Sequence, residues 1–272
     1  MGNVDAGLSG WKMTSNHNRM MELQRTSMKG GAGSVKIDYF GSSAFKITSP
    51  SGITLMIDPW RNHPSRKWDW YFNDFPLTEV DVKEANLESL TDYVKKFVNK
   101  MKLNNFILIG NSLGGHIGLI YSLLNPKKVK KLILTGSSGL YENSFGGSFP
   151  KRGDYNYIND RVNHTFYNPD ILTKKYIDEI FSTLNDNAKC LNIITIARSA
   201  QRNNLAKKLY KIKCPTLLVW GLNDTITPPS VAHQFNKLIP KSKLAFIDKC
   251  CHAPMMESPV KFNKIIKPFI YS

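Results

Sequence analysis

Several features are missing from this 272-residue sequence, and their absence narrows the choice of protein class. No apolar run reaches the roughly 20 residues that a membrane-spanning helix needs. The polar first 33 residues, rich in Met, Gly, Ser and Asn, contain no apolar core of a secretory signal. We therefore expect a cytoplasmic protein with no membrane partner, preceded by a poorly ordered leader over residues 1–33.

The chain is also poor in the residues that build disulfide frameworks and metal centres. Its four cysteines, Cys190, Cys214, Cys250 and Cys251, include no Cys-x-x-Cys pair. The six histidines are far apart, whereas metal sites usually draw on closely spaced ligands. We expect buried or reduced thiols and no bound metal.

Acidic residues are scarce, with 21 Asp and Glu against 37 Lys and Arg, which gives a formal net charge of +16. A strongly basic chain invites a search for a nucleic-acid site. The lysines, however, are scattered in short groups such as those between Lys127 and Lys131, and no nucleic-acid motif accompanies them. We interpret them as solvated surface and expect no specific nucleic-acid partner.

From Asn86 onward, apolar residues alternate between helical spacing and short continuous runs. This alternation is typical of a doubly wound, mostly parallel α/β sheet whose strands are covered on both faces. The expected strands are 106–109, 129–134, 216–220 and 244–247. The expected helices are 87–101, 114–124, 173–184, 190–200, 204–210, 230–238 and 259–270.

Residues 140–213 lack strands of the parallel type, and we interpret them as a helical lid inserted between two sheet strands. The predicted organisation is therefore a leader over 1–33, atypical N-terminal strands over 34–76, a first core part over 77–139, the lid over 140–213 and a second core part over 214–272.

The most informative motif is Gly110-x-Ser112-x-Gly114, which follows the apolar run 106–109 and precedes a helix-like segment. A strand, a sharp turn and a helix around Gly-x-Ser-x-Gly form a nucleophile elbow, in which the serine hydroxyl is exposed at a strained turn. A side chain at Gly110 or Gly114 would collide with the neighbouring strand or helix. Ser112 is therefore the candidate nucleophile.

A base and an acid follow at the ends of later strands. Asp224 comes just after the strand 216–220, and His252 just after the strand 244–247. Parallel strands present their carboxyl ends at one edge of the sheet, so these side chains can converge on Ser112. Asp248 is a rival acid, but it precedes His252 on the strand itself. We interpret His116 as a packing residue.

These pieces resemble the α/β-hydrolases of the broad esterase and carbon–carbon hydrolase type. The resemblance covers residues 77–272 and rests on Gly110-Asn-Ser-Leu-Gly-Gly115, Trp220-Gly-Leu-Asn-Asp224 with Thr227-Pro-Pro, and His252 with Glu257-Ser-Pro. It implies Ser112 as nucleophile, His252 as general base, Asp224 as the acid that orients it, and the Leu113 N–H as an oxyanion donor. It implies no cofactor.

The leading hypothesis is a serine hydrolase that cleaves a small ester or related carbonyl substrate through an acyl-enzyme. One alternative is hydrolysis of a carbon–carbon bond in a vinylogous diketone acid, although Ala253 and Pro254 stand where that subgroup leads us to expect an aromatic residue. A third hypothesis is an inactive binding protein, since no turn between Gly31 and Asp81 matches the one that supplies the second oxyanion donor.

The front of the chain resembles another family. The segments Val35–Ile47 and Ile53–Trp60 resemble the opening strands of metallo-β-lactamase-fold hydrolases, without the clustered histidines of that family's metal site. This resemblance favours a fusion joined near residues 73–80. The alternative is that both segments are diverged edge strands of the hydrolase sheet.

The lid is rich in basic and aromatic residues, which suggests a carboxylated small-molecule substrate. Arg198 is the candidate carboxylate ligand, because Ile194, Ala197 and Arg198 share a helix face that could look down on Ser112.

Overall fold

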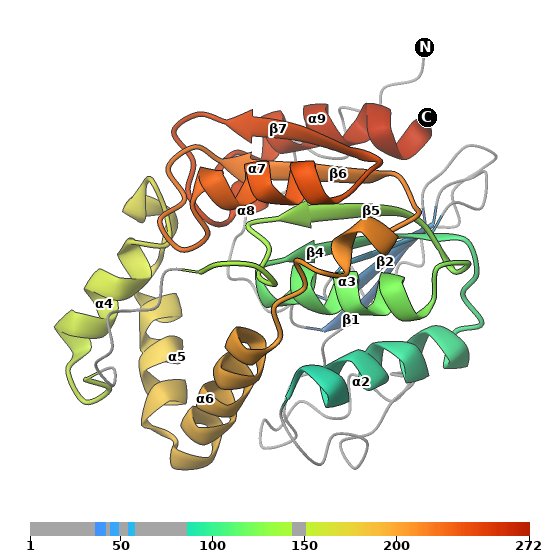
Figure 1. The fold of residues 1–272 in the computed structure, drawn as a ribbon. Coiled ribbons are helices and arrows are strands. Elements are labelled where there is room, and N and C mark those ends of the chain that lie inside the picture. Colours follow the sequence, from blue (N-terminus) through green and yellow to red (C-terminus); the bar gives the residue numbers. More distant parts are fainter. Residues whose placement is uncertain (1–35, 42–43, 49–53, 58–85, 143–150) are drawn as a thin grey trace.

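The computed structural model describes residues 36–41, 44–48, 54–57, 86–142 and 151–272, and its centre is a seven-stranded sheet in the order β1-β2-β3-β4-β5-β6-β7 (Figure 1). The strands are β1 (Lys36–Gly41), β2 (Ala44–Thr48), β3 (Thr54–Ile57), β4 (Phe106–Asn111), β5 (Val129–Thr135), β6 (Thr216–Gly221) and β7 (Ser242–Ile247). The pairs from β3 to β7 are all parallel, and β1 and β2 add antiparallel pairs at the edge beside β3. This mostly parallel α/β architecture confirms the predicted fold class.

Helices connect and cover the strands. They are α2 (Leu87–Lys100), α3 (Leu113–Leu124), α4 (Tyr155–Asn163), α5 (Lys174–Asn185), α6 (Asn187–Arg202), α7 (Pro229–Leu238), α8 (Pro254–Glu257) and α9 (Pro259–Tyr271), with short 3₁₀ turns η3 (Pro169–Ile171) and η4 (Leu209–Lys211). The helices α4, α5 and α6 all lie between β5 and β6 in sequence. They gather to one side of the sheet, beyond the carboxyl end of β5 (Figure 1).

The sheet core is divided between its two faces because side chains alternate along each strand. On one face, Leu108, Leu132 and Leu218 pack with residues of α2, α3 and α7. On the other face, Ile107 and Ile133 join a cluster that includes residues of α9. Burial on both faces explains why these strands read as continuous apolar runs in the sequence.

One helix prediction was wrong, and one helix of the inserted region was missed. Residues 204–210 contain only the turn η4 and not a helix, because the Asn204 side chain accepts a hydrogen bond from the Ala206 N–H and holds the backbone in a local turn. The helix α4 was not predicted. Its N-terminus is capped by Asp154, and it is a short, polar helix that buries only Ile158.

The strands predicted near the front of the chain are present as β1, β2 and β3. They belong to the same sheet as the rest, since β3 pairs in parallel register with β4. This is the placement that the edge-strand alternative expects. The predicted leader over residues 1–33 and the predicted junction near residues 73–80 lie outside the described residues.

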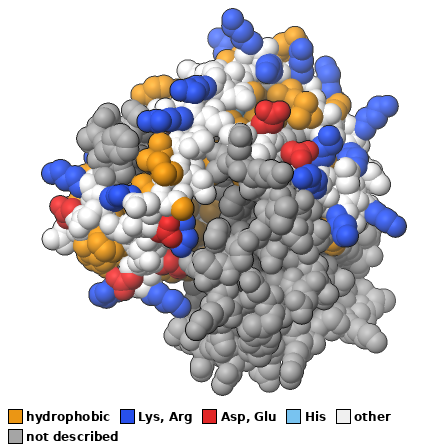
Figure 2. Space-filling view, turned by 90° about the horizontal axis from the view of Figure 1, so that it is seen from below, with side chains coloured by type: hydrophobic (Ala, Val, Ile, Leu, Met, Phe, Trp, Pro, Cys, Tyr) orange, Lys and Arg blue, Asp and Glu red, His pale blue; other side chains and the backbone are white. Residues whose placement is uncertain are grey.

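All four cysteines are free and buried, as expected from the sequence. Burial and the nearby Glu257 carboxylate raise the pKa of Cys250 to about 12 and that of Cys251 to about 11, so both thiols stay protonated at neutral pH. Basic side chains are spread over the described part of the face shown in Figure 2, interleaved with acidic and neutral groups. Among the helices of the described residues, none is long and apolar enough to cross a bilayer.

Candidate active site

The turn between β4 and α3 has the geometry of a nucleophile elbow. Ser112 occupies a strained backbone conformation, with φ 51° and ψ −121°, between the last residue of β4 and the first of α3. Its side chain does not cap α3, so the hydroxyl is not used by the helix end. A Cβ at Gly110 would lie 2.4 Å from the Gly114 carbonyl oxygen, which explains why glycine is required there.

His252 and Asp224 meet at the carboxyl edge of the sheet. The His252 Nδ1 lies 2.9 Å from the Asp224 Oδ2, and both side chains are almost completely buried. In this pairing Nδ1–H donates to the carboxylate, which leaves Nε2 as the nitrogen free to exchange a proton. The rival acid Asp248 is exposed, and among the described residues the ion-pair partner of His252 is Asp224.

Strand end Thr135–Gly136 contacts both Ser112 and His252. The Ser112 N–H donates to the Thr135 carbonyl oxygen at 2.9 Å. Gly136 has φ +46°, and a Cβ there would lie 2.9 Å from the His252 Nδ1. The imidazole therefore occupies space that only glycine leaves open. The structure thus brings all three predicted residues to one corner of the sheet.

The Asp224 carboxylate is held by more than His252. Its Oδ1 accepts from the backbone N–H groups of Ile226 (2.9 Å) and Thr227 (3.0 Å), and its Oδ2 accepts from the Thr227 hydroxyl (2.8 Å). The same hydroxyl lies 3.5 Å from the His252 Nδ1. Thr227 is completely buried, so it fixes the orientation of the carboxylate that faces the imidazole.

We expect Thr227→Val to lower kcat about 10- to 100-fold with little change in KM, because a hydrogen bond to a charged group typically contributes about 1.5–3 kcal/mol. Valine keeps the shape but removes the donor. Thr227→Ser keeps the donor and should retain most of the activity. Steady-state kinetics of both variants check this, and equal activity of Thr227→Val and wild type would show that Thr227 does not orient the acid.

The first N–H groups of α3, starting at Leu113, face the same corner as Ser112. The first N–H groups of a helix have no partner within the helix, and they carry the positive end of its dipole. The role of the Leu113 N–H as a donor to a developing oxyanion stays a prediction. Residues 31–81, where the turn with a second oxyanion donor was expected, lie mostly outside the described residues.

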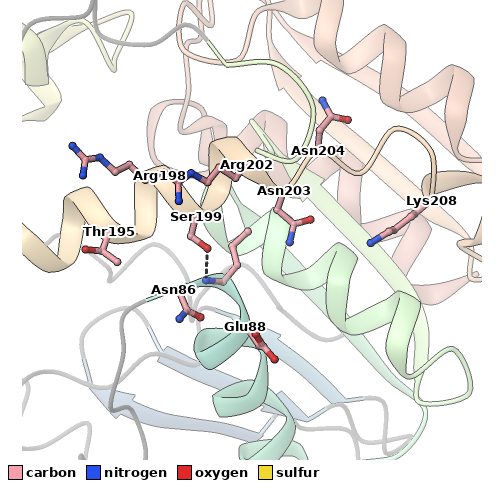
Figure 3. Close-up of a pocket in the computed structure, with 10 residues that line it drawn as sticks. Asn86, Glu88, Thr195, Arg198, Ser199, Arg202, Asn203, Asn204 and Lys208 are labelled. Carbon is pink, nitrogen blue, oxygen red and sulfur yellow. Dashed lines mark hydrogen bonds between the residues drawn. The ribbon is translucent and has the colours of Figure 1, made fainter.

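Arg198 is not placed beside Ser112. It lines a cavity of about 680 Å³ between the start of α2 and the end of α6 (Figure 3), and none of Ser112, Asp224 and His252 lines that cavity. Among the described residues, three cationic side chains line it (Arg198, Arg202 and Lys208), against one acidic residue, Glu88. The Ser199 hydroxyl accepts from the Leu87 N–H at 3.1 Å, which ties α6 to the start of α2.

His116 is fully buried on α3, and neither ring nitrogen has a partner with hydrogen-bond geometry among the described residues. It lies against Gly139, just before the inserted helices, and the nearby Asn203 backbone lies just after them. Burial lowers the pKa of His116 to about 4, and the Asn203 backbone offsets this only in part. His116 is therefore neutral at physiological pH.

This pKa predicts a pH-dependent stability. His116 titrates at about 4 in the fold and near 6.5 when exposed, so the unfolded chain binds more protons between these values. The free energy of unfolding has its full value above pH 6.5 and falls as the pH drops towards 4. Protonation of His116 accounts for a loss of about 3 kcal/mol. Urea unfolding from pH 4.5 to 7.5 should show a shallower dependence in His116→Leu. Parallel curves for the variant and wild type would contradict the prediction.

No group of three or more His, Cys, Asp or Glu side chains in the described ranges is arranged to hold a metal ion. The site described so far consists of a serine at a strained turn, a buried imidazole–carboxylate pair and free helix N–H groups. Such a set supports nucleophilic attack on a carbonyl carbon, followed by proton transfer through the imidazole.

Comparison with known proteins identifies the family. A family model described as alpha/beta hydrolase fold matches residues 60–167 and 167–259. The chain therefore belongs to the alpha/beta hydrolase fold family.

Particular relatives are similar at modest identity. The chain is 25% identical over 200 residues to 2-hydroxy-6-oxononadienedioate/2-hydroxy-6-oxononatrienedioate hydrolase 2 of Pseudomonas putida, covering 65% of this chain and 66% of that protein. It is 28% identical to putative esterase/lipase 2 of Mycoplasma genitalium, covering 75% and 80%. The crystal structure of MGS-MChE2, an alpha/beta hydrolase enzyme from a sediment metagenome of the Mar Chica lagoon in Morocco, shares 36% identity with a TM-score of 0.56, covering 72% and 74%.

Proposed function

We propose that this chain is a serine hydrolase that cleaves a small ester or a related carbonyl substrate through an acyl-enzyme. The observation that carries the proposal is the 2.9 Å contact between His252 Nδ1 and Asp224 Oδ2, at the sheet edge where Ser112 occupies its strained turn. Family membership supports the reaction class, and the esterase-type relative supports an ester substrate.

In the proposed reaction, the Ser112 Oγ attacks the carbonyl carbon while the His252 Nε2 takes its proton. Asp224 keeps the second imidazole proton on Nδ1 and stabilises the imidazolium that forms. The Leu113 N–H donates to the oxyanion of the tetrahedral intermediate. As this intermediate collapses, His252 returns the proton to the leaving alcohol. Water, activated by the same imidazole, then releases the acid and restores the Ser112 hydroxyl.

A panel of p-nitrophenyl esters of increasing acyl length tests the proposal most simply. We expect turnover of short-chain esters, with no requirement for added metal and no loss of activity in EDTA. A folded protein that hydrolyses none of these esters and no carbon–carbon substrate would favour the third hypothesis, an inactive binding protein.

The alternative substrate is a vinylogous diketone acid cleaved at a carbon–carbon bond. One observation favours it: several relatives are named as 2-hydroxy-6-oxononadienedioate/2-hydroxy-6-oxononatrienedioate hydrolases. Against it stand Ala253 and Pro254 after the histidine. Parallel assays on an ester and on a 2-hydroxy-6-oxo-dienoate of matched size separate the two.

We propose further that Arg198 binds a substrate carboxylate. A guanidinium forms a bidentate pair with a carboxylate, and no carboxylate pairs with Arg198 in the part of the chain that the structure describes. Arg198→Met should lower the kcat/KM ratio of a carboxylated ester over its neutral isostere about 10- to 100-fold, the effect of about 1.5–3 kcal/mol. Arg161→Met, on α4 and outside the cavity, is the matched control. An unchanged ratio in Arg198→Met would remove Arg198 from the substrate site.

Three further proposals concern the organisation of the chain. The inserted residues 140–213 act as a lid over the sheet edge between core parts 77–139 and 214–272. The stretch 34–76 resembles the opening strands of metallo-β-lactamase-fold hydrolases, either as a fused segment or as diverged edge strands of the hydrolase sheet. The protein works in the cytoplasm, a location supported by its four free cysteines.

A further inference from the structure

The loop that carries His252 is hydrogen-bonded to the inserted segment just after α4. The His252 N–H donates to the Thr165 carbonyl oxygen at 3.2 Å, just past the end of α4. On its other side, the His252 carbonyl oxygen accepts from the Asn111 side-chain amide at 3.0 Å, next to Ser112. The backbone of His252 thus bridges the inserted segment and the elbow.

The Glu257 carboxylate links the same two segments. Its Oε1 accepts from the Cys251 N–H at 2.8 Å and from the Ala253 N–H at 3.4 Å, the N–H groups of the two residues that flank His252. Its Oε2 accepts from the Tyr167 N–H at 2.6 Å, on the inserted segment two residues past Thr165. The Glu257 carboxylate therefore accepts hydrogen bonds from both segments, Thr165–Tyr167 and Cys251–Ala253.

The position of Glu257 suits this role. It is the last residue of α8, the single turn of helix that follows Ala253, and the Glu257 N–H itself donates to the Ala253 carbonyl oxygen at 3.0 Å. The short helix thereby turns the side chain back onto the loop it follows. Hydrogen bonds to an ionised acceptor are about twice as strong as neutral ones, so the carboxylate is a better clamp for three N–H groups than an amide.

We propose that Glu257 is a positioning residue, which ties the segment Thr165–Tyr167 to the His252 loop and so holds the imidazole in line between Asp224 and Ser112. This inference rests on the proposed function, since it assigns Glu257 a part in the same reaction. Glu257 touches neither substrate nor reacting atoms. It acts through the backbone on either side of His252.

The proposal predicts a defect in turnover without a defect in binding. In Glu257→Ala, kcat should fall about 10- to 100-fold with KM nearly unchanged, because small misplacements of catalytic groups cost up to about 10²-fold. Labelling of Ser112 by a fluorophosphonate should slow by the same factor. Glu257→Gln keeps one acceptor oxygen, so its kcat should lie between those of Glu257→Ala and wild type. Asp248→Ala, which removes an exposed carboxylate four residues before His252, is the matched control and should behave as wild type.

Amide hydrogen exchange provides the structural readout. In Glu257→Ala, the amides of Cys251, His252, Ala253 and Tyr167 should exchange faster together, while the strands of the sheet keep their protection. Unchanged kcat and unchanged exchange would overturn the proposal. So would accelerated exchange throughout the sheet, because Glu257 would then support the whole fold rather than this loop.

The proposed function and the role of Glu257 can be tested separately. If the wild-type protein neither reacts with the fluorophosphonate nor turns over any substrate, the proposed function is wrong. Exchange still decides the Glu257 contact in that case: joint acceleration at Tyr167 and at the His252 loop supports it, and independent behaviour overturns it. If wild type is active and Glu257→Ala equals Asp248→Ala in kcat, only the role of Glu257 is wrong.

Discussion

Replacing Ser112 by alanine should reduce kcat by about 10⁴- to 10⁶-fold while the protein stays folded, because loss of the nucleophile removes the covalent step altogether. The strained turn is a property of the backbone around Gly110 and Gly114, and alanine fits there as well as serine. Steady-state kinetics at saturating substrate, with an unfolding curve for each protein, measure both parts of the prediction.

The partner residue supplies the control. His252→Ala should cause a loss of similar size, and the double variant Ser112→Ala/His252→Ala should be little worse than either single variant, since members of a triad act as one unit. Fully additive losses would mean that the two residues serve different steps. Substantial turnover by Ser112→Ala on any substrate would remove it as the nucleophile.

Changing Asp224 to asparagine should lower kcat by about 10³- to 10⁴-fold. The asparagine amide can still accept from the N–H groups of Ile226 and Thr227 through its oxygen. Its NH₂ group would then face the His252 Nδ1 and favour the tautomer with the proton on Nε2, which cannot accept a proton from Ser112.

The matched control for this variant is Asp248→Asn. Asp248 directly follows β7, four residues before His252, and its side chain is exposed. We expect Asp248→Asn to keep wild-type kcat. A large loss in Asp248→Asn together with a small one in Asp224→Asn would reverse the assignment of the acid.

The sequence was sufficient to predict the parallel strands β4 to β7 and to propose the candidate residues. The strands β4, β5 and β6 are buried on both faces, so their continuous apolar runs were unambiguous. The elbow could be located because glycine spacing around Ser112 reflects a local steric requirement, which the close approach of Gly110 to the Gly114 backbone now shows. Asp224 and His252 could be proposed because chain order and strand ends are readable from local pattern alone.

The remaining features depend on contacts between distant segments. Glu257 and Tyr167 are 90 residues apart, and nothing local at either position announces the contact. Glu257 and Thr227 stood within quoted motifs, but their roles depend on the orientation of one carboxylate or hydroxyl. Helix periodicity placed Arg198 on one face of its helix, and that face was expected to lie towards Ser112. Periodicity does not show which element packs against a helix face, and Arg198 lines a cavity that Ser112 does not line.

The helix α4 illustrates a different limit. It packs mainly with α5, including contact of the Tyr155 and Phe181 rings at 5.3 Å, and it buries only Ile158. A polar helix of nine residues offers few apolar positions to detect, so the Asp154 cap was its main local signal.

The central claim is that Ser112 is a nucleophile activated by His252 and Asp224. Its most direct test is incubation of the folded wild-type protein with a fluorophosphonate, followed by mass spectrometry of the proteolysed product. We predict a single phosphonylated residue, Ser112, with no labelling in Ser112→Ala and strongly slowed labelling in His252→Ala. A folded wild-type protein that remains unlabelled, or that is labelled at another serine, would contradict the account.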